Sequence, residues 1–256
     1  MLRYKEKEDI EARYVEVDGA VSEWRAQSGE VSAELLSALS HKLLISLIFH
    51  DSALEGEVLT YGEINAAIDT NIISDATLIP AYEDIKGFHN ACNRATEIAT
   101  AKRKQAITID TVREIYALLA PDEAEKGCPY RKENPLHRLY YHDIAPPEKI
   151  SQQMRKLGEW MERADTVAMH PIERAARTHY KIMAVFPWAK QTGRTARIIS
   201  NLILAQAGYP LAVIHSIDRQ RYYEALRGSP KTLLSVYLEA VETTATSSLR
   251  VYEEAG

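Results

Sequence analysis

The chain contains 256 residues, 46% of them hydrophobic and 26% charged, with a formal net charge of −5. This composition is ordinary for a globular protein with one large core or two smaller ones. The acidic balance argues against a broad nucleic-acid-binding surface, which would be basic. The two cysteines, Cys92 and Cys128, imply no disulfide framework. Because the first residues are charged and the longest apolar run, 43–49, is too short to span a bilayer, we expect a cytoplasmic protein that does not bind membranes.

Apolar residues recur three and four positions apart along most of the chain, a pattern typical of amphipathic helices. Ser32 and Asp110 stand at two expected helix starts, and Pro147 and Pro171 fall where the first turn of a helix tolerates proline. In chain order, the expected helices cover residues 6–27, 32–54, 76–103, 108–119, 147–163, 168–184, 193–207 and 230–253.

Strand signals are scarce. One segment, 127–147, predicts a short hairpin, with HRLYYHDI as its most strand-like run. The predicted fold class is therefore mainly α, with one short β-hairpin. We divide the chain into an N-terminal helical region (1–104), a central core (105–230) and a C-terminal helix (231–256) that packs on the core.

Several common functional motifs are absent from the sequence: the phosphate-binding GxxxxGK[ST] loop, GxGxxG after a strand, HExxH and GxSxG. His170 and Glu173 could present two metal ligands on one helical face, but the proline between them is typical of a helix start, so we predict no metal site. His179 lies on the apolar side of its expected helix and is predicted to be a core residue. Cys128 has no partner at zinc-ligand spacing.

The stretch VFPWAKQTGRTAR, 185–197, has the features of a phosphate site. Thr192 and Gly193 open an expected helix, and Arg194 and Arg197 follow on one face of it. A helix start exposes unpaired N–H groups, glycine permits close approach of an anion, and guanidinium groups suit phosphate oxygens. A second interpretation stays open, in which Thr192 caps the helix and the arginines pair with acidic side chains.

A longer stretch around this segment resembles a known family. HPIERAARTHYKIMAVFPWAKQTGRTARIISNLILAQAGYPLAVI (170–214), followed by DRQRYYEAL, is similar to the core of a Fic-family domain, whose motif runs HPFx[D/E]GNGRxxR. RKENPLHRLYYHDIAPPEKI (131–150) resembles the family's β-hairpin flap. HDSALEGEVLTYGEI (50–64) resembles its inhibitory helix, with the pattern [S/T]xxxE[G/N], which we place at 44–56. In all, the resemblance covers about residues 40–230.

The resemblance implies a Fic-type helical bundle with a short β-hairpin flap, and the transfer of AMP from ATP to a hydroxyl group of a target protein. In the family, the motif histidine is the base and the motif acid holds Mg²⁺. The Gly-Asn-Gly segment and two arginines bind the phosphates, and the inhibitory glutamate pairs with the second arginine. The flap aligns the target segment as an added strand.

This chain departs from the motif at the positions that carry the chemistry. Phe186 occupies the base position, and Lys190 replaces the acid that holds the metal. Trp188 replaces the motif phenylalanine, and Gln191 and Thr192 replace the first glycine and the asparagine. A side chain at 191 also restricts the positive φ angle that an anion nest often needs.

The remaining motif positions match. Gly193, Arg194 and Arg197 agree with the motif, and Glu55 agrees with the inhibitory glutamate, whereas Asp51 stands where serine or threonine is usual. From the resemblance we expect Glu55 to be regulatory. The candidate nucleotide- or phosphate-binding residues are Lys190, Thr192, Gly193, Arg194, Arg197 and Tyr222.

We expect a Fic-family protein that is related to protein adenylyltransferases but inactive in the family's usual reaction, since Phe186 cannot take a proton. We expect ATP or another nucleotide as a ligand, without Mg²⁺. Two interpretations of Lys190 stay open: its single positive charge replaces the metal beside the phosphates, or its side chain points into solvent from a loop. The expected partner is a target protein that docks at the hairpin, 130–143, and a homo-oligomer stays open. Two alternatives also stay open: an active nucleotidyl or phosphoryl transferase of another kind, and a structural peptide-binding module.

Overall fold

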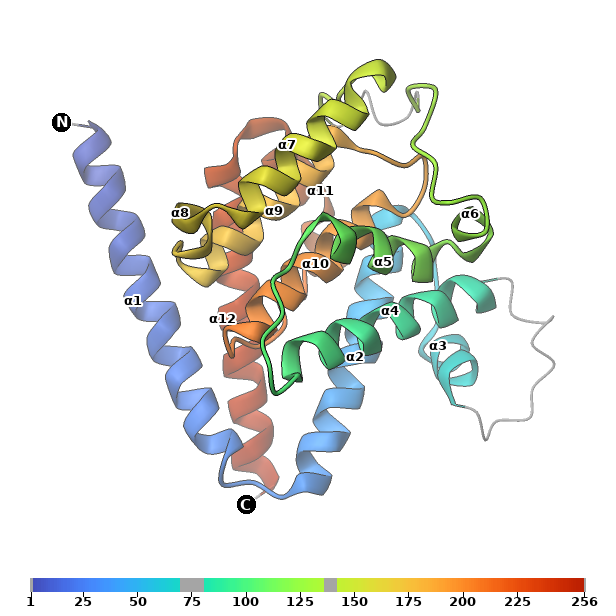
Figure 1. Ribbon diagram of the computed structural model, residues 1–256. Helices are drawn as coiled ribbons and strands as arrows, with labels where there is room; N and C mark the ends of the chain where they lie inside the picture. The colour runs from blue at the N-terminus through green and yellow to red at the C-terminus, as the bar shows by residue number, and fades with distance from the viewer. Residues whose placement is uncertain (1, 70–80, 136–141, 256) are drawn as a thin grey trace.

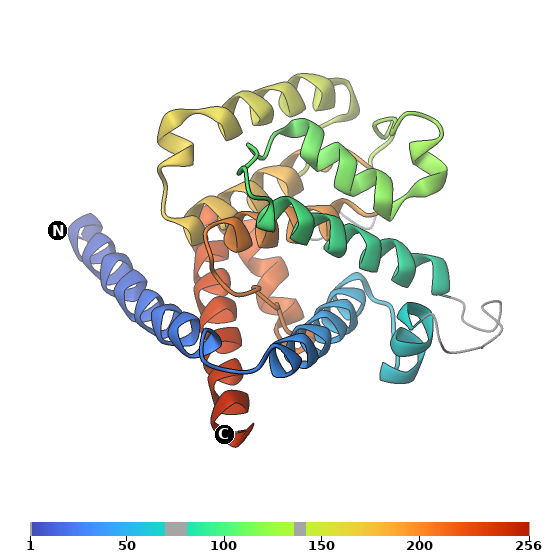
Figure 2. The same ribbon diagram turned by 60° about the horizontal axis from the view of Figure 1, so that its bottom comes forward.

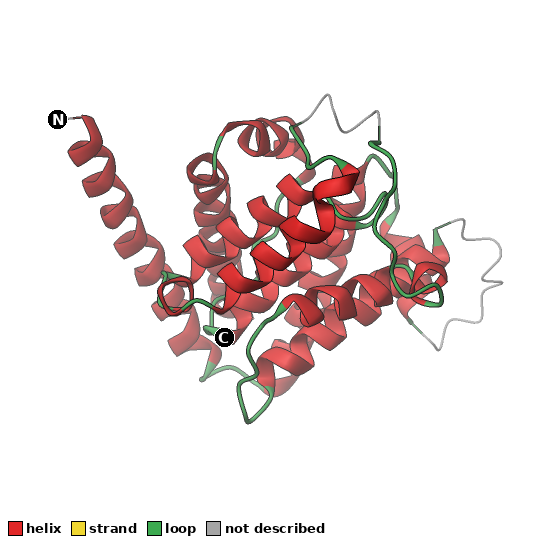
Figure 3. Cartoon of the chain, turned by 45° about the horizontal axis from the view of Figure 1, so that its top comes forward, coloured by secondary structure: helices red, strands yellow, loops and turns green. Residues whose placement is uncertain are grey.

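The structure is a computed structural model that describes residues 2–69, 81–135 and 142–255. Every regular element in this described part of the chain is a helix, and Figure 3 shows no strand there. The helices are α1 (Leu2–Ser28), α2 (Ala33–Glu55), α3 (Tyr61–Ile68), α4 (Tyr82–Thr100), α5 (Ile109–Leu119), α6 (Pro121–Ala124), η3 (Pro147–Lys149), α7 (Ile150–Glu162), α8 (Ala164–Val167), α9 (Pro171–Val185), α10 (Thr192–Gln206), η4 (Ser216–Asp218), α11 (Arg219–Gly228) and α12 (Pro230–Ala255). The prediction of a mainly α fold is confirmed.

Two of the predicted helix starts agree with the structure. The Ser32 hydroxyl oxygen accepts the Leu35 N–H at 3.2 Å and caps α2. Pro171 is the first residue of α9. The predicted range 108–119 agrees with α5 to within one residue, but the cap is Thr108 and not Asp110, and the Thr108 N–H donates to the Thr111 hydroxyl oxygen at 3.2 Å.

The helical pattern missed α3, which has a clear start signal. The Thr60 hydroxyl oxygen accepts the Glu63 N–H at 3.2 Å, and the Glu63 carboxylate accepts the Thr60 N–H at 2.7 Å. This reciprocal capping stabilises a helix of only eight residues, which is too short for its apolar spacing to be noticed. Of the helix predicted over 76–103, the part at 76–80 lies outside the described residues.

The predicted β-hairpin flap is not supported. Residues 127–135 and 142–147 contain no strand, and the middle of the predicted hairpin, 136–141, lies outside the described residues. In place of a cross-strand ladder, the Arg131 N–H donates to the Pro187 carbonyl oxygen at 3.0 Å, and the Ala145 N–H donates to the Ala184 carbonyl oxygen at 2.9 Å. Prolines at 129, 135, 146 and 147 further remove donors that a ladder would need.

Helix α10 forms the centre of the molecule and packs against α9, α4 and α5 (Figures 1 and 2). All residues from Thr192 to Leu204 are buried, so even its polar side chains must find partners inside the protein. Helix α12 packs against α9 on one side and α1 on another. The N-terminal end of α1 extends away from the other helices in each ribbon view.

Helix α2 brings the segment that resembles the inhibitory helix to the N-terminal end of α10. By length and composition alone, α2 is long and apolar enough to cross a membrane, with a mean hydropathy of 1.2 in its most apolar window, of which 22% is buried. Helix α2 packs here against α3, α4 and η4, and its last turn carries the buried Asp51 and Ser52.

Candidate anion-binding site

The motif loop between α9 and α10 has a fixed shape. Phe186 ends α9 in the left-handed conformation (φ 47°), and Gln191 adopts the same conformation (φ 62°) just before α10. The Thr192 hydroxyl donates to the Trp188 carbonyl oxygen at 2.8 Å, which closes the turn. Trp188 stacks on Tyr116 of α5, with ring centroids 3.8 Å apart. The side chain at 191 therefore does not prevent the positive φ angle at the start of α10.

Asp51 joins the two arginines of the motif. Its carboxylate accepts the Nε–H of Arg194 at 3.0 Å through one oxygen and the Nε–H of Arg197 through the other. The Asp51 side chain is 1% exposed, and those of Arg194 and Arg197 are 3% and 5% exposed. The acidic side chain that replaces the usual serine or threonine thus bridges both guanidinium groups inside the protein.

The remaining donors of Arg194 are used by neighbouring side chains. Its terminal nitrogens donate to the Ser52 hydroxyl oxygen at 3.3 Å, to the Glu57 carboxylate and to the Gln191 side-chain oxygen at 3.2 Å. Burial lowers the pKa of the Arg194 guanidinium, but the charges of Asp51, Glu57 and Glu55 outweigh it and raise the pKa. Arg194 is therefore held as a paired cation.

Arg197 is paired in a similar way. Its terminal nitrogens donate to the Glu55 carboxylate at 2.8 Å and to the Tyr222 hydroxyl oxygen at 3.1 Å. Burial lowers the pKa of Arg197, but Asp51, Tyr222 and Glu55 outweigh it, and the pKa is raised well above its usual value. The contact between Glu55 and Arg197 is the pairing that the resemblance implies for the inhibitory glutamate.

Gly193 makes room for the Glu55 carboxylate. A Cβ atom at position 193 would collide with the Glu55 Oε1 atom. The place that a glycine keeps open for a phosphate oxygen is therefore taken by a carboxylate oxygen of the chain itself.

Tyr222 lies behind Arg197 as part of a buried polar chain. Its hydroxyl group contacts the His179 Nε2 atom at 2.9 Å, and the His179 Nδ1 atom contacts the Tyr237 hydroxyl at 2.6 Å. Burial is the main reason that the pKa of His179 is held well below its usual value, and the charge of Arg197 adds to the effect. His179 is a core histidine, and Tyr222, which is 0% exposed, presents no free ring face to a nucleotide base in this structure.

Two other candidate residues do not point to the arginines. Lys190 is exposed and borders a different pocket, beside residues 129–135. The Thr192 hydroxyl is used within the motif loop. The structure therefore groups Gly193, Arg194, Arg197 and Tyr222 with Glu55, and it leaves Lys190 and Thr192 outside that group.

Phe186 occupies the base position and is 1% exposed. An imidazole lies near it: the centroid of the His142 ring is 6.2 Å from that of Phe186. The His142 Nε2–H donates to the Met183 carbonyl oxygen at 2.9 Å, and the side chain is buried. This histidine is held against the main chain of α9.

Arg131 anchors the predicted flap to the motif loop, a role that the sequence analysis missed. Its Nε–H donates to the Phe186 carbonyl oxygen at 2.7 Å, and its terminal nitrogens donate to the Asn134 side-chain oxygen at 2.6 Å and to the Ala145 carbonyl oxygen. A cation at the C-terminal end of α9 is favourable, since the carbonyl groups there have no helical partners. Nothing in the local sequence marks this contact, which joins positions 55 residues apart.

Residues 106–204, which include the motif loop and α10, match the Fic/DOC family. The chain carries a Fic/DOC domain. The protein adenylyltransferase Fic of Nematostella vectensis is 32% identical over 182 residues, which are 70% of this chain and 42% of the relative. The chain thus spans about two fifths of the length of the curated relatives it matches, 42% and 40% for two of them.

Solved Fic structures share the fold. Fic-1 from C. elegans superposes with a TM-score of 0.82 at 21% identity, over 100% of this chain and 77% of that one. A Fic-domain signaling protein from Bacteroides thetaiotaomicron superposes with a TM-score of 0.78 at 21% identity, over 93% of this chain and 97% of that one. At this identity the likeness establishes the all-helical Fic fold, and the chemistry of this copy must be argued from its own residues.

Proposed function

We propose that this protein is a Fic-domain protein that binds a phosphate-bearing ligand, with ATP or another nucleotide as the first candidate, and does not transfer AMP by the family's usual route. We further propose that residues 51–57 close the phosphate site in the resting protein. The observation that carries the proposal is the position of Asp51, which is buried and bridges the two arginines that the family uses for phosphate.

Two features support a closed site: the net charge around the two motif arginines, and the hydrogen bonds that their donors already make. Three carboxylates, those of Asp51, Glu55 and Glu57, face two guanidinium groups. A triphosphate that approached this pocket would meet a negative net charge and guanidinium donors that are already bonded. Binding therefore requires the end of α2 to move.

The residues at and near the base position support the proposal that this protein does not transfer AMP by the usual route. Removing a general base costs a factor of about 10²–10⁴ in rate, and Phe186 has no group that accepts a proton. His142 is an imidazole nearby, but its Nε2–H is bonded to a main-chain carbonyl oxygen. Holding a nucleotide needs only the donors of Arg194, Arg197 and Gly193, which this chain retains.

The residues present do not fit the Mg²⁺ ion that the resemblance implies. Lys190 offers a protonated amine, which has no electron pair for a metal, at the position of the acid. Among the described residues, no cluster of three His, Cys, Asp or Glu side chains could hold a metal ion. We therefore propose binding without a metal, through the donors of Arg194, Arg197 and Gly193 alone.

The test opens the pocket by substitution. In the double variant Asp51→Ser/Glu55→Gly, which retains both arginines, ATP should bind in the presence of EDTA, as measured by calorimetric titration, and raise the thermal unfolding midpoint. The wild-type protein should give a much smaller heat. Adding Arg194→Ala to the double variant should abolish binding. If the opened variant folds and ATP neither releases heat nor raises its unfolding midpoint, the arginines are structural and the proposal is wrong.

A second candidate function is the docking of a target protein beside the flap. A pocket of about 960 Å³ lies between residues 129–135 and the motif loop, and its wall includes Glu83, Asp84, Asp122 and Glu123. A pull-down from a cell lysate tests this candidate. If wild-type protein and Asp51→Ser/Glu55→Gly both recover a target protein, and Asp84→Lys/Asp122→Lys does not, the result favours docking that is independent of nucleotide.

A further inference from the structure

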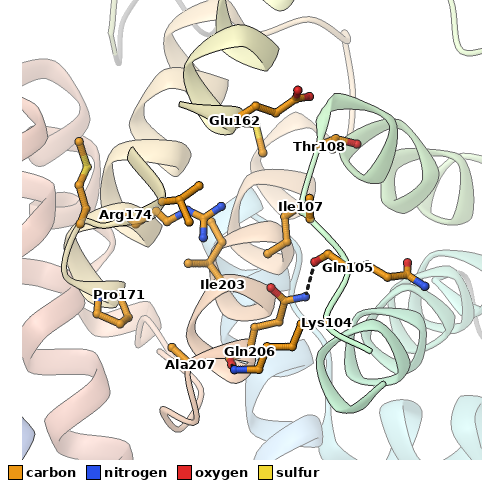
Figure 4. Close-up of a pocket in the computed structure, with 14 residues that line it drawn as sticks. Lys104, Gln105, Ile107, Thr108, Glu162, Pro171, Arg174, Ile203, Gln206 and Ala207 are labelled. Carbon is orange, nitrogen blue, oxygen red and sulfur yellow. Dashed lines mark hydrogen bonds between the residues drawn. The ribbon is translucent and has the colours of Figure 1, made fainter. Parts of the chain in front are cut away.

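A second pocket lies at the other end of α10, about 20 Å along the helix from Gly193 at 1.5 Å per residue. It has a volume of about 610 Å³, within the range of small-molecule sites. It opens between residues 104–108 on one side and the turn from α8 to α9 on the other (Figure 4). The end of α10 forms its floor. None of the candidate residues of the phosphate site lines it.

Arg174 of α9 enters this pocket without an acidic partner. Figure 4 shows its side chain directed into the pocket, apart from Glu162 on the wall. In the described part of the chain, no side chain or carbonyl oxygen accepts a hydrogen bond from its guanidinium group, and no carboxylate lies within 4.0 Å of it. Burial alone lowers the pKa of Arg174. Arg174 is only partly buried and solvent still reaches its guanidinium group, so it presents to the pocket a positive charge without an acidic partner among the described residues.

The wall of the pocket combines apolar and polar side chains, with one further cation at the rim. Val167, Met169 and Pro171 present accessible apolar surface, and Ile107, Met161 and Ile203 lie buried beneath it. The polar side chains of the wall are Gln105, Thr108, Glu162 and Gln206. The Lys104 ammonium group donates to the Gln206 carbonyl oxygen at 3.0 Å, so Lys104 remains at the edge of the pocket. A cationic group beside accessible apolar side chains matches a ligand with an anionic head and an apolar body.

We propose that this pocket is a binding site for a small organic carboxylate, whose carboxylate group pairs with Arg174 and whose apolar body contacts Val167, Met169 and Pro171. A carboxylate fits a guanidinium group through two parallel hydrogen bonds, which an alcohol or an amine cannot reproduce. The site is distinct from the phosphate pocket, and it stands whether or not that pocket binds a nucleotide.

The methionines allow a direct test. Two of the five, Met161 and Met169, line the pocket, whereas Met154 and Met183 do not. In protein labelled with ¹³C at the methionine methyl groups, hexanoate should cause saturable shifts of the Met161 and Met169 signals and leave those of Met154 and Met183 in place. Hexan-1-ol and hexylamine have an apolar chain one methylene longer than that of hexanoate, and each should still bind at least about tenfold more weakly, because neither forms the charged pair with Arg174.

Two variants separate the role of Arg174 from a general effect of charge. Arg174→Gln should weaken hexanoate binding by about tenfold or more and remove its preference over hexan-1-ol. Arg177→Gln changes the next arginine of the same helix, which pairs with Glu173 outside the pocket, and should leave binding unchanged. The proposal is overturned if hexanoate gives no saturable shift of Met161 and Met169, or if Arg174→Gln binds hexanoate as well as wild type does.

Discussion

The arginines at the two ends of α10 differ in burial and in their partners. At the N-terminal end, Arg194 and Arg197 are almost fully buried and are bonded to three carboxylates of the segment 51–57. At the C-terminal end, Arg174 enters a pocket with no acidic partner among the described residues. The sequence marks the first pair strongly, through the Fic motif, and does not mark Arg174 at all.

The difference shows that an arginine in a family motif does not by itself have donors available for an anion. What matters is how many of its donors the protein already uses and how much negative charge faces it. By this measure the motif arginines already have their donors in use, whereas Arg174 has no acidic partner among the described residues. Each prediction below tests one side of this contrast, from the largest expected effect to the smallest.

Asp51→Ala should have the largest effect on stability, because it removes the carboxylate that Arg194 and Arg197 share. Two buried guanidinium groups would each lose a partner, and breaking a buried ion pair from one side costs about 3–5 kcal/mol. Urea denaturation measures the loss. Glu159→Ala, which removes an exposed partner of Arg155, is the control and should change little. Equal losses in the two variants would mean that the Asp51 bridge contributes no more than a surface pair.

Acid should lower the stability of the folded protein through His179, which belongs to the same buried network. The unfolded chain takes up a proton at histidine below a pH of about 6.5, but the folded protein keeps His179 neutral because burial, aided by Arg197, lowers its pKa. Stability should therefore fall as the pH drops below about 6.5, by up to about 1.4 kcal/mol per pH unit from this group.

Unfolding measured at several pH values tests the effect. The pKa of His50 is lowered to about 4 by burial and by His215, so His50 adds a slope of the same sign. His179→Gln should reduce the slope without removing it. A slope that His179→Gln leaves unchanged would place the acid sensitivity elsewhere.

Gly193→Ala should disturb the contact between Glu55 and Arg197. The added methyl group meets the Glu55 carboxylate, and overpacking a filled site costs about 1–3 kcal/mol. In the double variant Glu55→Gly/Gly193→Ala the collision is absent, so the two losses of stability should not add. Additive losses would show that the carboxylate does not occupy the space beside Gly193.

Arg174→Leu should change stability by only about 0.5 kcal/mol or less, since it removes a charge that no acidic group compensates. The matched variant Arg194→Leu should be strongly destabilising, because it removes one of the two arginine partners of the buried Asp51 and the partner of Glu57. The ratio of the two losses, from urea denaturation, sharpens the contrast between the ends of α10. A large loss in Arg174→Leu would mean that Arg174 supports the fold.

The sequence predicted the helical class, most helix positions and the arginines of the motif, because apolar spacing and proline positions are local signals. It also identified Asp51 as a departure from the family pattern, but it could not show that the carboxylate bridges Arg194 and Arg197, about 140 positions away. Three acidic residues within 51–57 could have suggested a segment complementary to two arginines. The contact itself depends on the packing of α2 beside α10, which no local pattern specifies.

The predicted flap, 127–147, is a case in which a local sequence signal was misleading. HRLYYHDI has strong strand propensity, and most of it lies outside the described residues. On either side of it, Arg131 and Ala145 bond to the motif loop and to α9. Propensity reports what a segment can form with a suitable partner, and tertiary contacts decide which partner it meets. Arg131, which holds both ends of the segment, would not have been selected from a charged run such as RKEN.

Glu55→Gly should have the smallest effect on activity: we expect the variant to show no AMP transfer. Removal of Glu55 alone leaves Asp51 on both arginines and Phe186 at the base position. Incubation of this variant with α-³²P-ATP, alone and with a cell lysate, should therefore give no labelled protein. Labelling that is lost on Arg197→Ala would show that a base other than the motif residue acts in this pocket. His142, with its ring centroid 6.2 Å from that of Phe186, would then be the first side chain to substitute, since a shift of residues 142–145 away from α9 would release its imidazole from the Met183 carbonyl group.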